Sequence, residues 1–108
     1  MKQQITGGVT APKGYSANGV YAGISKTPEL VAARKPDLAL LVSDPPAQAA
    51  GVFTTNLVKG HSLQRTARIL QAGASVNAIV INSGNANACV GASGDQAADA
   101  LAATVAAE

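Results

Sequence analysis

Aromatic side chains are scarce in this sequence. The 108 residues include no tryptophan, and the only tyrosines and phenylalanine are Tyr15, Tyr21 and Phe53. Hydrophobic residues nevertheless make up 47% of the chain, which excludes a disordered segment and is enough for a packed core. Small and aliphatic side chains must therefore carry the packing, which favours closely apposed layers. At this length we expect one domain over residues 1–108.

Cysteine and histidine are nearly absent. One cysteine, Cys89, excludes an internal disulfide, and one histidine, His61, leaves too few ligands for a zinc site of cysteines and histidines. We expect no bound cofactor and no metal. His61 precedes a predicted helix, where a protonated imidazole is unfavourable, so an ordinary exposed histidine is expected. The apolar neighbours of Cys89 favour a small buried residue over a reactive thiol.

Concentrated charge and long apolar runs are missing as well. Eight basic and six acidic residues give a formal net charge of +2, and the basic residues form no block beyond Arg34-Lys35. This excludes the concentrated basic face of a nucleic-acid-binding protein. No run approaches the roughly 18 apolar residues of a membrane span, and the first residues do not resemble a signal peptide. A cytoplasmic location with no membrane partner is the expectation.

The first half of the chain carries strand and turn signals. Asn18-Gly19 lies between apolar residues and predicts a β-hairpin within residues 7–24. Prolines in residues 25–36 indicate a surface excursion. The apolar run 37–43, followed by Asp44-Pro45-Pro46, predicts a strand buried on both faces. A second strand is predicted at 49–55, with Gly51 marking a bulge or a close backbone approach.

The second half alternates helices with a strand. Helical spacing predicts an amphipathic helix from Ser62 as N-cap to Gly73 as stop. Residues 76–82 are the clearest strand, and a loop over 83–89 follows. An alanine-rich helix then begins at Asp95, with Asp99 also near its positive end and one face formed by Ala98, Leu101 and Val105. That helical pattern continues to Glu108 without a stop signal, which predicts a truncated chain. The expected class is α/β, a layered sandwich.

The loop after the strand 76–82 is the candidate site, with five polar or glycine residues: Asn82, Ser83, Gly84, Asn85 and Asn87. Ligands in α/β proteins usually dock at the carboxyl ends of strands. Asparagine offers donors and acceptors, and glycine allows backbone amides to point at an anion or carbonyl. The alternative is a turn in which the asparagines satisfy their own backbone. Residue types alone favour the turn.

Other chemistry finds little support. Thr54 and Thr55 would need a base to act as nucleophiles, and packing at a strand end explains them better. The carboxylates, including Asp37, lie in cap, turn or terminal contexts and form no acid–base pair. There is no phosphate-binding loop or dinucleotide fingerprint.

Three stretches together resemble the ornithine acetyltransferases, also called bifunctional glutamate N-acetyltransferases. They are residues 8–15, residues 37–40 with 50–56, and residues 78–89. They stand in the family's order and span nearly the whole chain. Two positions depart from the family pattern: Val90 replaces a threonine, and Gly60-His61-Ser62 replaces Ala-Ala-Pro.

The resemblance implies an incomplete α/β sandwich from an enzyme that moves an acetyl group from N-acetylornithine to glutamate. It leaves open whether acetyl-CoA is also a substrate. The family's precursors cut themselves ahead of a threonine, which becomes the nucleophile, and their α and β chains assemble as α2β2 heterotetramers. Neither that threonine nor the Ser-Thr-Gly oxyanion segment is found before Glu108. The resemblance therefore implies the first part of an α chain, with no catalytic residue in this stretch.

Two alternatives remain open. One is a non-enzymatic α/β module that binds a small anion through the 82–87 loop. The other is a purely structural interaction domain with no ligand.

Overall fold

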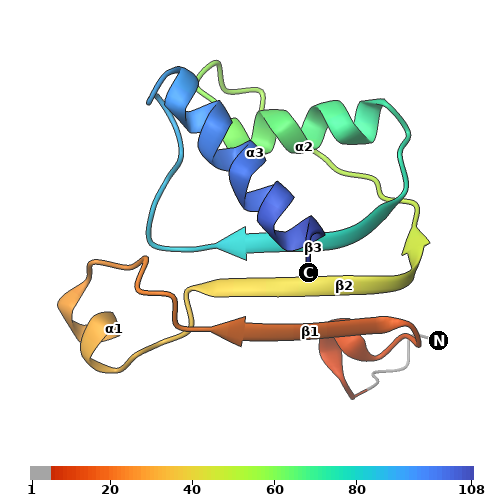
Figure 1. Cartoon of the computed structure of the whole chain (residues 1–108), viewed down its shortest axis with the longest axis horizontal. Coiled ribbons are helices and arrows are strands. Elements are labelled where there is room, and N and C mark those ends of the chain that lie inside the picture. The colour runs from red at the N-terminus through yellow and green to blue at the C-terminus, as the bar shows by residue number, and fades with distance from the viewer. Residues whose placement is uncertain (1–5) are drawn as a thin grey trace. The chain divides into compact units, whose positions relative to one another are not determined.

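The computed structural model describes residues 6–108, in which strands and helices alternate (Figure 1). The elements in chain order are η1 (Gly8–Thr10), β1 (Tyr15–Val20), α1 (Pro28–Ala32), β2 (Leu38–Ala47), α2 (His61–Gln71), β3 (Val76–Asn82) and α3 (Ala92–Ala106).

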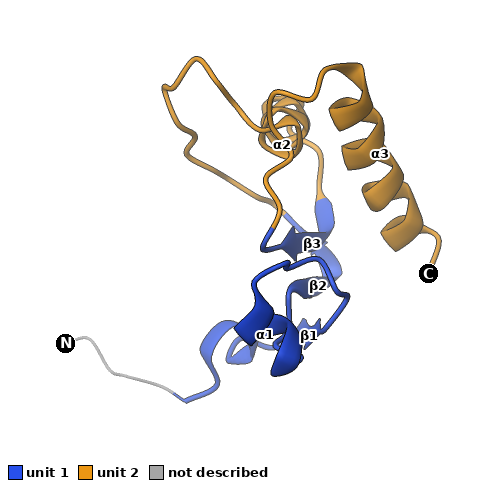
Figure 2. Ribbon diagram, turned by 90° about the vertical axis from the view of Figure 1, so that its left-hand side faces the viewer, with its two compact units in different colours: residues 1–47, 76–84 blue, residues 48–75, 85–108 orange. Residues whose placement is uncertain are grey.

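The chain divides into two compact units (Figure 2). The sheet unit comprises residues 1–47 and 76–84, and the helix unit comprises residues 48–75 and 85–108. Each unit is described by itself.

The sheet unit contains three antiparallel strands in the order β1-β2-β3 (Figure 1). β3 spans the residues that the sequence predicts, and its register places Asn82 opposite Leu38. The prediction of a strand at 37–43 is also confirmed. The two strands pair because their β-branched and aliphatic residues suit a pleated surface.

The predicted hairpin at Asn18-Gly19 is wrong. Both residues lie inside β1, where Asn18 is opposite Leu40 and Gly19 is opposite Ala39. The Asn18 side-chain oxygen accepts a hydrogen bond from the Gly19 amide at 2.9 Å, but the chain does not reverse there. Pairing with β2 along the whole of β1 outweighs the local turn preference of this dipeptide.

β2 is longer and less buried than predicted. It continues through Asp44-Pro45-Pro46 to Ala47, and its register against β3 shifts between Val42 and Ala47. Such an irregularity accommodates Pro45 and Pro46, which have no backbone N–H to donate to a neighbouring strand. The first six residues of β2 are half-buried, so the expectation of burial on both faces is also wrong.

The strand predicted at 49–55 is not formed. These residues are coil in the helix unit, and Val52 is fully exposed. An apolar run becomes a strand only beside a partner strand, and none lies beside it within the described residues. Gly51 marks neither a bulge nor a close approach of another backbone; side chains approach it instead, since a Cβ there would lie 3.0 Å from Leu70 Cδ1.

The helices follow the predicted periodicity. α2 begins two residues earlier than predicted, with Gly60 rather than Ser62 as N-cap. Gly73 ends it as predicted, with φ +68° and an amide that donates to the Leu70 carbonyl oxygen at 3.1 Å. α3 begins at Ala92, so Asp95 lies in its first turn but Asp99 does not. The surface excursion at 25–36 contains the short helix α1.

The expected packed core is small. Among the described hydrophobic residues only Ala98, at 8% exposure, is buried. The buried polar residues are Ser25 and Asp37, each 5% exposed.

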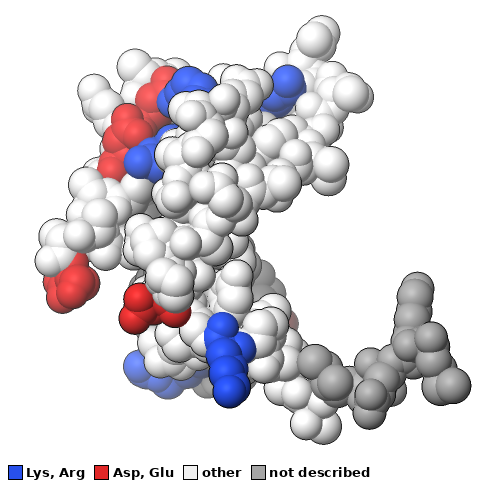
Figure 3. All heavy atoms as spheres, turned by 90° about the vertical axis from the view of Figure 1, so that its right-hand side faces the viewer, with Lys and Arg blue, Asp and Glu red and all other residues white. Residues whose placement is uncertain are grey.

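Surface charge is dispersed. On the face drawn in Figure 3, basic side chains stand singly or next to acidic ones. Within the helix unit, an ion pair joins Arg65 Nε to Asp99 Oδ1 at 2.8 Å. The described part of this face therefore lacks the continuous basic area that nucleic-acid binding requires.

Candidate functional site

The candidate loop begins where β3 ends, and residues 83–89 are irregular as predicted. The boundary between the two units falls between Gly84 and Asn85. Asn82, Ser83 and Gly84 therefore belong to the sheet unit, whereas Asn85 and Asn87 belong to the helix unit. The structure does not establish the five residues as one site.

In the sheet unit, the backbone of the loop is tightly held. The Ser83 amide donates a hydrogen bond to the Asp37 carbonyl oxygen at 2.9 Å. Gly84 has φ +86°, and a Cβ at this position would lie 2.8 Å from the Cα of Ser25. Only glycine combines this conformation with so close an approach to another backbone.

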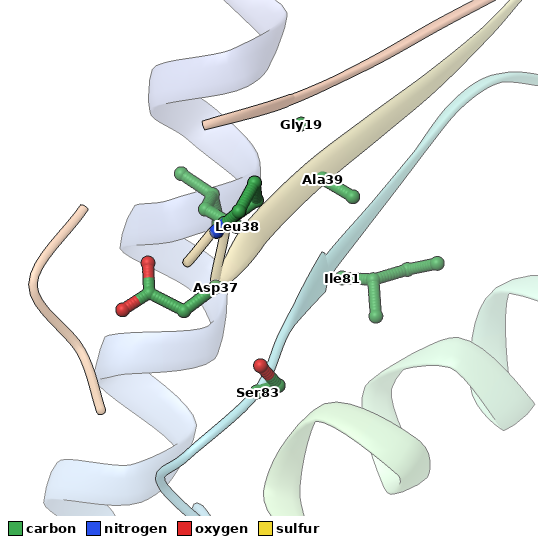
Figure 4. A pocket seen from close by; sticks show the side chains of 7 residues that line it. Gly19, Asp37, Leu38, Ala39, Ile81 and Ser83 are labelled. Carbon is green, nitrogen blue, oxygen red and sulfur yellow. The ribbon is translucent and has the colours of Figure 1, made fainter. Parts of the chain in front are cut away.

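Asp37 organises this side of the loop, a role that no periodic sequence pattern predicts. Its carboxylate accepts hydrogen bonds from the amides of Ala22, Ile24 and Ser25, at 2.7, 2.7 and 3.0 Å. The bonds from Ser25 and Ala22 lower the pKa of Asp37 below its ordinary value of 3.8, against the opposing effect of burial, and the Ile24 bond adds to them. In Figure 4 the carboxylate points away from the strands toward the loop segment beside it.

One signal for Asp37 is visible in the sequence. It stands alone between Pro36 and the apolar run that opens β2. A carboxylate beside a buried strand needs donors, because burying it unpaired would be costly. The sequence spacing does not show which amides donate to this carboxylate, since they lie 12 to 15 residues earlier in the chain.

A shallow cavity of about 120 Å³ adjoins this region of the sheet unit (Figure 4). Gly19, Leu38, Ala39 and Ile81 give it a largely apolar lining. Sites for small organic ligands usually measure about 300–1,000 Å³ and contain oriented polar groups. The cavity is therefore smaller than a typical ligand site and has few polar groups in its lining.

In the helix unit, Asn87 connects the starts of both helices. Its carbonyl oxygen accepts a hydrogen bond from the His61 amide at 2.8 Å. Its side-chain amide donates to the Gly94 carbonyl oxygen, also at 2.8 Å. The Asn87 side chain thus serves a structural turn, and Asn82 and Asn85 are engaged as well.

His61 is not the exposed residue that the sequence predicts. Its side chain is 12% exposed, and Nδ1 lies 2.9 Å from Asp95 Oδ1. The carboxylate can only accept, so Nδ1 carries the shared hydrogen. The ring lies against Gly94, where an added Cβ would collide with it. The expectation failed because Gly94 provides space and Asp95 provides a partner, both more than 30 residues away.

Within residues 6–108, no third side chain hydrogen-bonds to the imidazole of this carboxylate–imidazole pair. The remaining ring nitrogen, Nε2, is buried and has no hydrogen-bond partner. The ring contacts Gly94, and a base must have a hydroxyl or thiol within reach to activate it. The pair therefore connects α2 to α3 within the helix unit.

The remaining candidates, Cys89, Thr54 and Thr55, are all exposed in the helix unit. Cys89 is exposed and has φ +58°, so the prediction of a buried residue is wrong. Thr54 lies in exposed coil, where its hydroxyl oxygen accepts the Asn56 amide at 3.1 Å. That bond closes a local turn, and Thr55 is likewise exposed. Within residues 6–108, no three potential metal ligands gather, and no helix has the length and apolarity to cross a membrane.

Comparison with solved structures identifies the class of protein. The chain is similar to the ornithine acetyltransferase of Mycobacterium tuberculosis, solved in complex with ornithine, with a TM-score of 0.76 and 43% identity. That match covers 87% of this chain and 46% of the other. The arginine biosynthesis bifunctional protein ArgJ of Bacillus halodurans gives a TM-score of 0.78 at 34% identity, covering 90% and 47%. The fold is therefore the α/β fold of ornithine acetyltransferases, as expected.

Sequence comparison agrees. The ArgJ family model matches residues 16–108, and the chain belongs to this family. It is 51% identical to the arginine biosynthesis bifunctional protein ArgJ of Thermosynechococcus vestitus over 104 residues, which are 96% of this chain and 23% of that protein. A chloroplastic ArgJ of rice is 42% identical over 104 residues, 93% of this chain and 21% of that protein. The chain spans about a quarter of the length of these curated relatives.

Proposed function

We propose that this chain is the N-terminal part of the α chain of an ornithine acetyltransferase, which moves an acetyl group from N-acetylornithine to glutamate. One observation carries the proposal. The fold of 87% of the chain matches an ornithine acetyltransferase complexed with ornithine, at 43% identity.

The proposed reaction is a two-step acyl transfer on a threonine encoded beyond Glu108. Its free amine takes the proton of its own hydroxyl, the oxygen attacks the acetyl carbonyl, and ornithine leaves with a proton. The amine of glutamate then attacks the acetyl-threonine ester and restores the hydroxyl. In this scheme the present chain contributes no reacting group, and residues 82–87 support the wall of the pocket.

The geometry favours support over direct anion binding. The Ser83 amide donates to Asp37, and the Asn87 side-chain amide donates to Gly94. An anion would have to displace these internal hydrogen bonds before it could use the same donors. The alternative of an anion-binding module therefore has no observation in its favour.

The assembly and the setting are part of the proposal. We expect the remaining α-chain segment and the β chain as partners in an α2β2 heterotetramer, with no bound cofactor and with acetyl-CoA as an additional acetyl donor. The bifunctional names of the relatives support the last point. A cytoplasmic location remains a prediction, and the rice and poplar relatives are chloroplastic.

The test uses the complete reading frame that contains this sequence. After expression, gel electrophoresis should show self-cleavage into two chains. Purified enzyme should convert N-acetylornithine and glutamate into ornithine and N-acetylglutamate in equal amounts, measured by mass spectrometry. Omitting N-acetylornithine and adding acetyl-CoA isolates the second activity. An uncleaved protein without acetyl transfer from either donor would refute the proposal.

A further inference from the structure

Asp37 joins three separate stretches of the sheet unit. Its own amide donates to the Val20 carbonyl oxygen at 3.0 Å, at the end of β1. Its carbonyl oxygen accepts the Ser83 amide at 2.9 Å, just after β3. Its carboxylate accepts three amides between residues 22 and 25. Every polar group of this residue therefore makes a hydrogen bond, as a residue that is only 5% exposed requires.

These contacts reach the candidate loop by two routes. The first is direct, through the bond from Ser83 to the Asp37 carbonyl oxygen. The second runs through Ser25, whose amide is bound by the carboxylate at 3.0 Å. Gly84 lies against this same Ser25 backbone, with its missing Cβ only 2.8 Å from Ser25 Cα. The position of Gly84 thus depends on where the carboxylate holds Ser25.

We propose that Asp37 is a positioning residue for acetyl transfer, which fixes the backbone of Ser83 and Gly84 through these two routes. The inference rests on the proposed function, because it assigns those residues to the wall of the acetyl-transfer pocket. Asp37 contacts no reacting atom. It acts by holding a wall in place, and displacement of a pocket wall by about 1 Å can lower a rate by as much as 100-fold.

The carboxylate is specifically required by the three donors. Both of its oxygens accept, and one of them accepts two amides. Asp37→Asn keeps nearly the same shape but replaces one oxygen with an NH2 group, which would face a backbone donor. The volume is conserved, so the variant tests hydrogen bonding rather than packing.

The experiment compares Asp37→Asn with wild type in the complete, self-cleaved enzyme. Both kcat and KM for N-acetylornithine are measured per mole of folded enzyme, with the folded fraction taken from circular dichroism. We expect kcat/KM to fall on the order of tenfold or more. A residue with a purely structural role would lower the yield of folded enzyme but leave kcat and KM of the surviving molecules unchanged.

Asp99→Asn is the matched control. It makes the same chemical change at a carboxylate of the helix unit, where Asp99 pairs with Arg65. Its kcat and KM should stay within about twofold of wild type, because exposed ion pairs contribute little. An equal loss in both variants would overturn the proposal.

Gly84→Ala approaches the same contact from the other side. The new methyl group would collide with the Ser25 backbone and should lower kcat/KM in the same direction as Asp37→Asn. Folded variants that keep wild-type kcat and KM would overturn the inference. Failure of both variants to fold would also overturn it, because Asp37 and Gly84 would then be needed only for folding. These outcomes count against the inference only if the wild-type enzyme is active. A wild type with no acetyl transfer would instead refute the proposed function.

Discussion

The interactions that stabilise the sheet unit internally differ from those that stabilise the helix unit. The sheet unit combines backbone ladders with one buried carboxylate that binds three amides. The helix unit joins α2 to α3 through two side-chain pairs one helical turn apart, the His61–Asp95 hydrogen bond and the Arg65–Asp99 ion pair. Asp37 is 5% exposed, whereas the side chain of Asp99 is 64% exposed. A buried charge with converging donors fixes a structure far more firmly than an exposed pair does.

The largest effect should follow loss of the Asp37 charge. Because its folded pKa is lowered, its contribution to stability is present above pH 3.8 and disappears as the pH falls through the folded value. Asp37→Asn should lower Tm by roughly 10 °C near neutral pH, and this difference from wild type should vanish in acid. Thermal melts from about pH 2 to pH 7 measure it.

Amide exchange assigns this effect to the sheet unit. The amides of Ala22, Ile24 and Ser25 should lose protection in Asp37→Asn, because their acceptor is changed. Unchanged protection, or a Tm difference that persists in acid, would contradict the prediction.

The next effect concerns the contact between His61 and Gly94. Gly94→Ala should destabilise the helix unit by about 1–3 kcal/mol, because the methyl group would collide with the imidazole ring. This loss should appear although alanine favours helix formation by about 1 kcal/mol over glycine. Chemical denaturation followed by a probe in α3 measures it.

A double-mutant cycle isolates that collision. In a His61→Ala background the ring is absent, so Gly94→Ala should be neutral or stabilising. An equal loss in both backgrounds would show that the ring is not the cause.

A smaller effect is expected at the Arg65–Asp99 ion pair. Asp99→Asn should cost about 0.2–1 kcal/mol, since Arg65 and Asp99 are 32% and 64% exposed. About 1 M salt should shrink the difference from wild type, because it screens exposed charges. Arg65→Gln should give a similar loss, and the double variant little more. A salt-independent loss would argue against an ion-pair contribution.

The smallest effect should come from the exposed coil of the helix unit. Leu57 is 97% exposed, so Leu57→Ser should change the free energy of unfolding of this chain by no more than about 0.5 kcal/mol. Leu70→Ser should cost more, since Leu70 is half-buried and closely approaches Gly51. Equal losses at the two leucines would refute the packing described for this region.

Features set by short-range patterns could be predicted from the sequence. The strand β3 and the helix α2 were found almost to the residue, because their apolar residues have a clear period and Gly73 marks the end of α2. The loop after β3 was also placed correctly. Local sequence preference gave the wrong prediction where strand pairing determines the structure. Asn18-Gly19 lies inside β1 and not in a turn, and residues 49–55 have no partner strand and form no strand.

The candidate site was harder to predict for the same reason. Residue types identified Asn87 and Gly84, but not what they contact. The roles of His61 and Asp37 depend on groups far along the chain: Asp95 lies 34 residues after His61, and Ala22 lies 15 residues before Asp37. Gly94 makes room for the His61 ring and Gly84 makes room for the Ser25 backbone, but such contacts produce no periodic pattern in the sequence. The family resemblance is confirmed by comparison, whereas the role of the loop remains a prediction.

The close fit of the His61 ring against Gly94 has an evolutionary consequence. Position 94 cannot be exchanged freely while histidine stands at 61, because a side chain at 94 excludes the imidazole, whereas a smaller residue at 61 removes the need for glycine. Related sequences should therefore change these two positions together, and a library randomised at both would return histidine at 61 only in combination with glycine at 94.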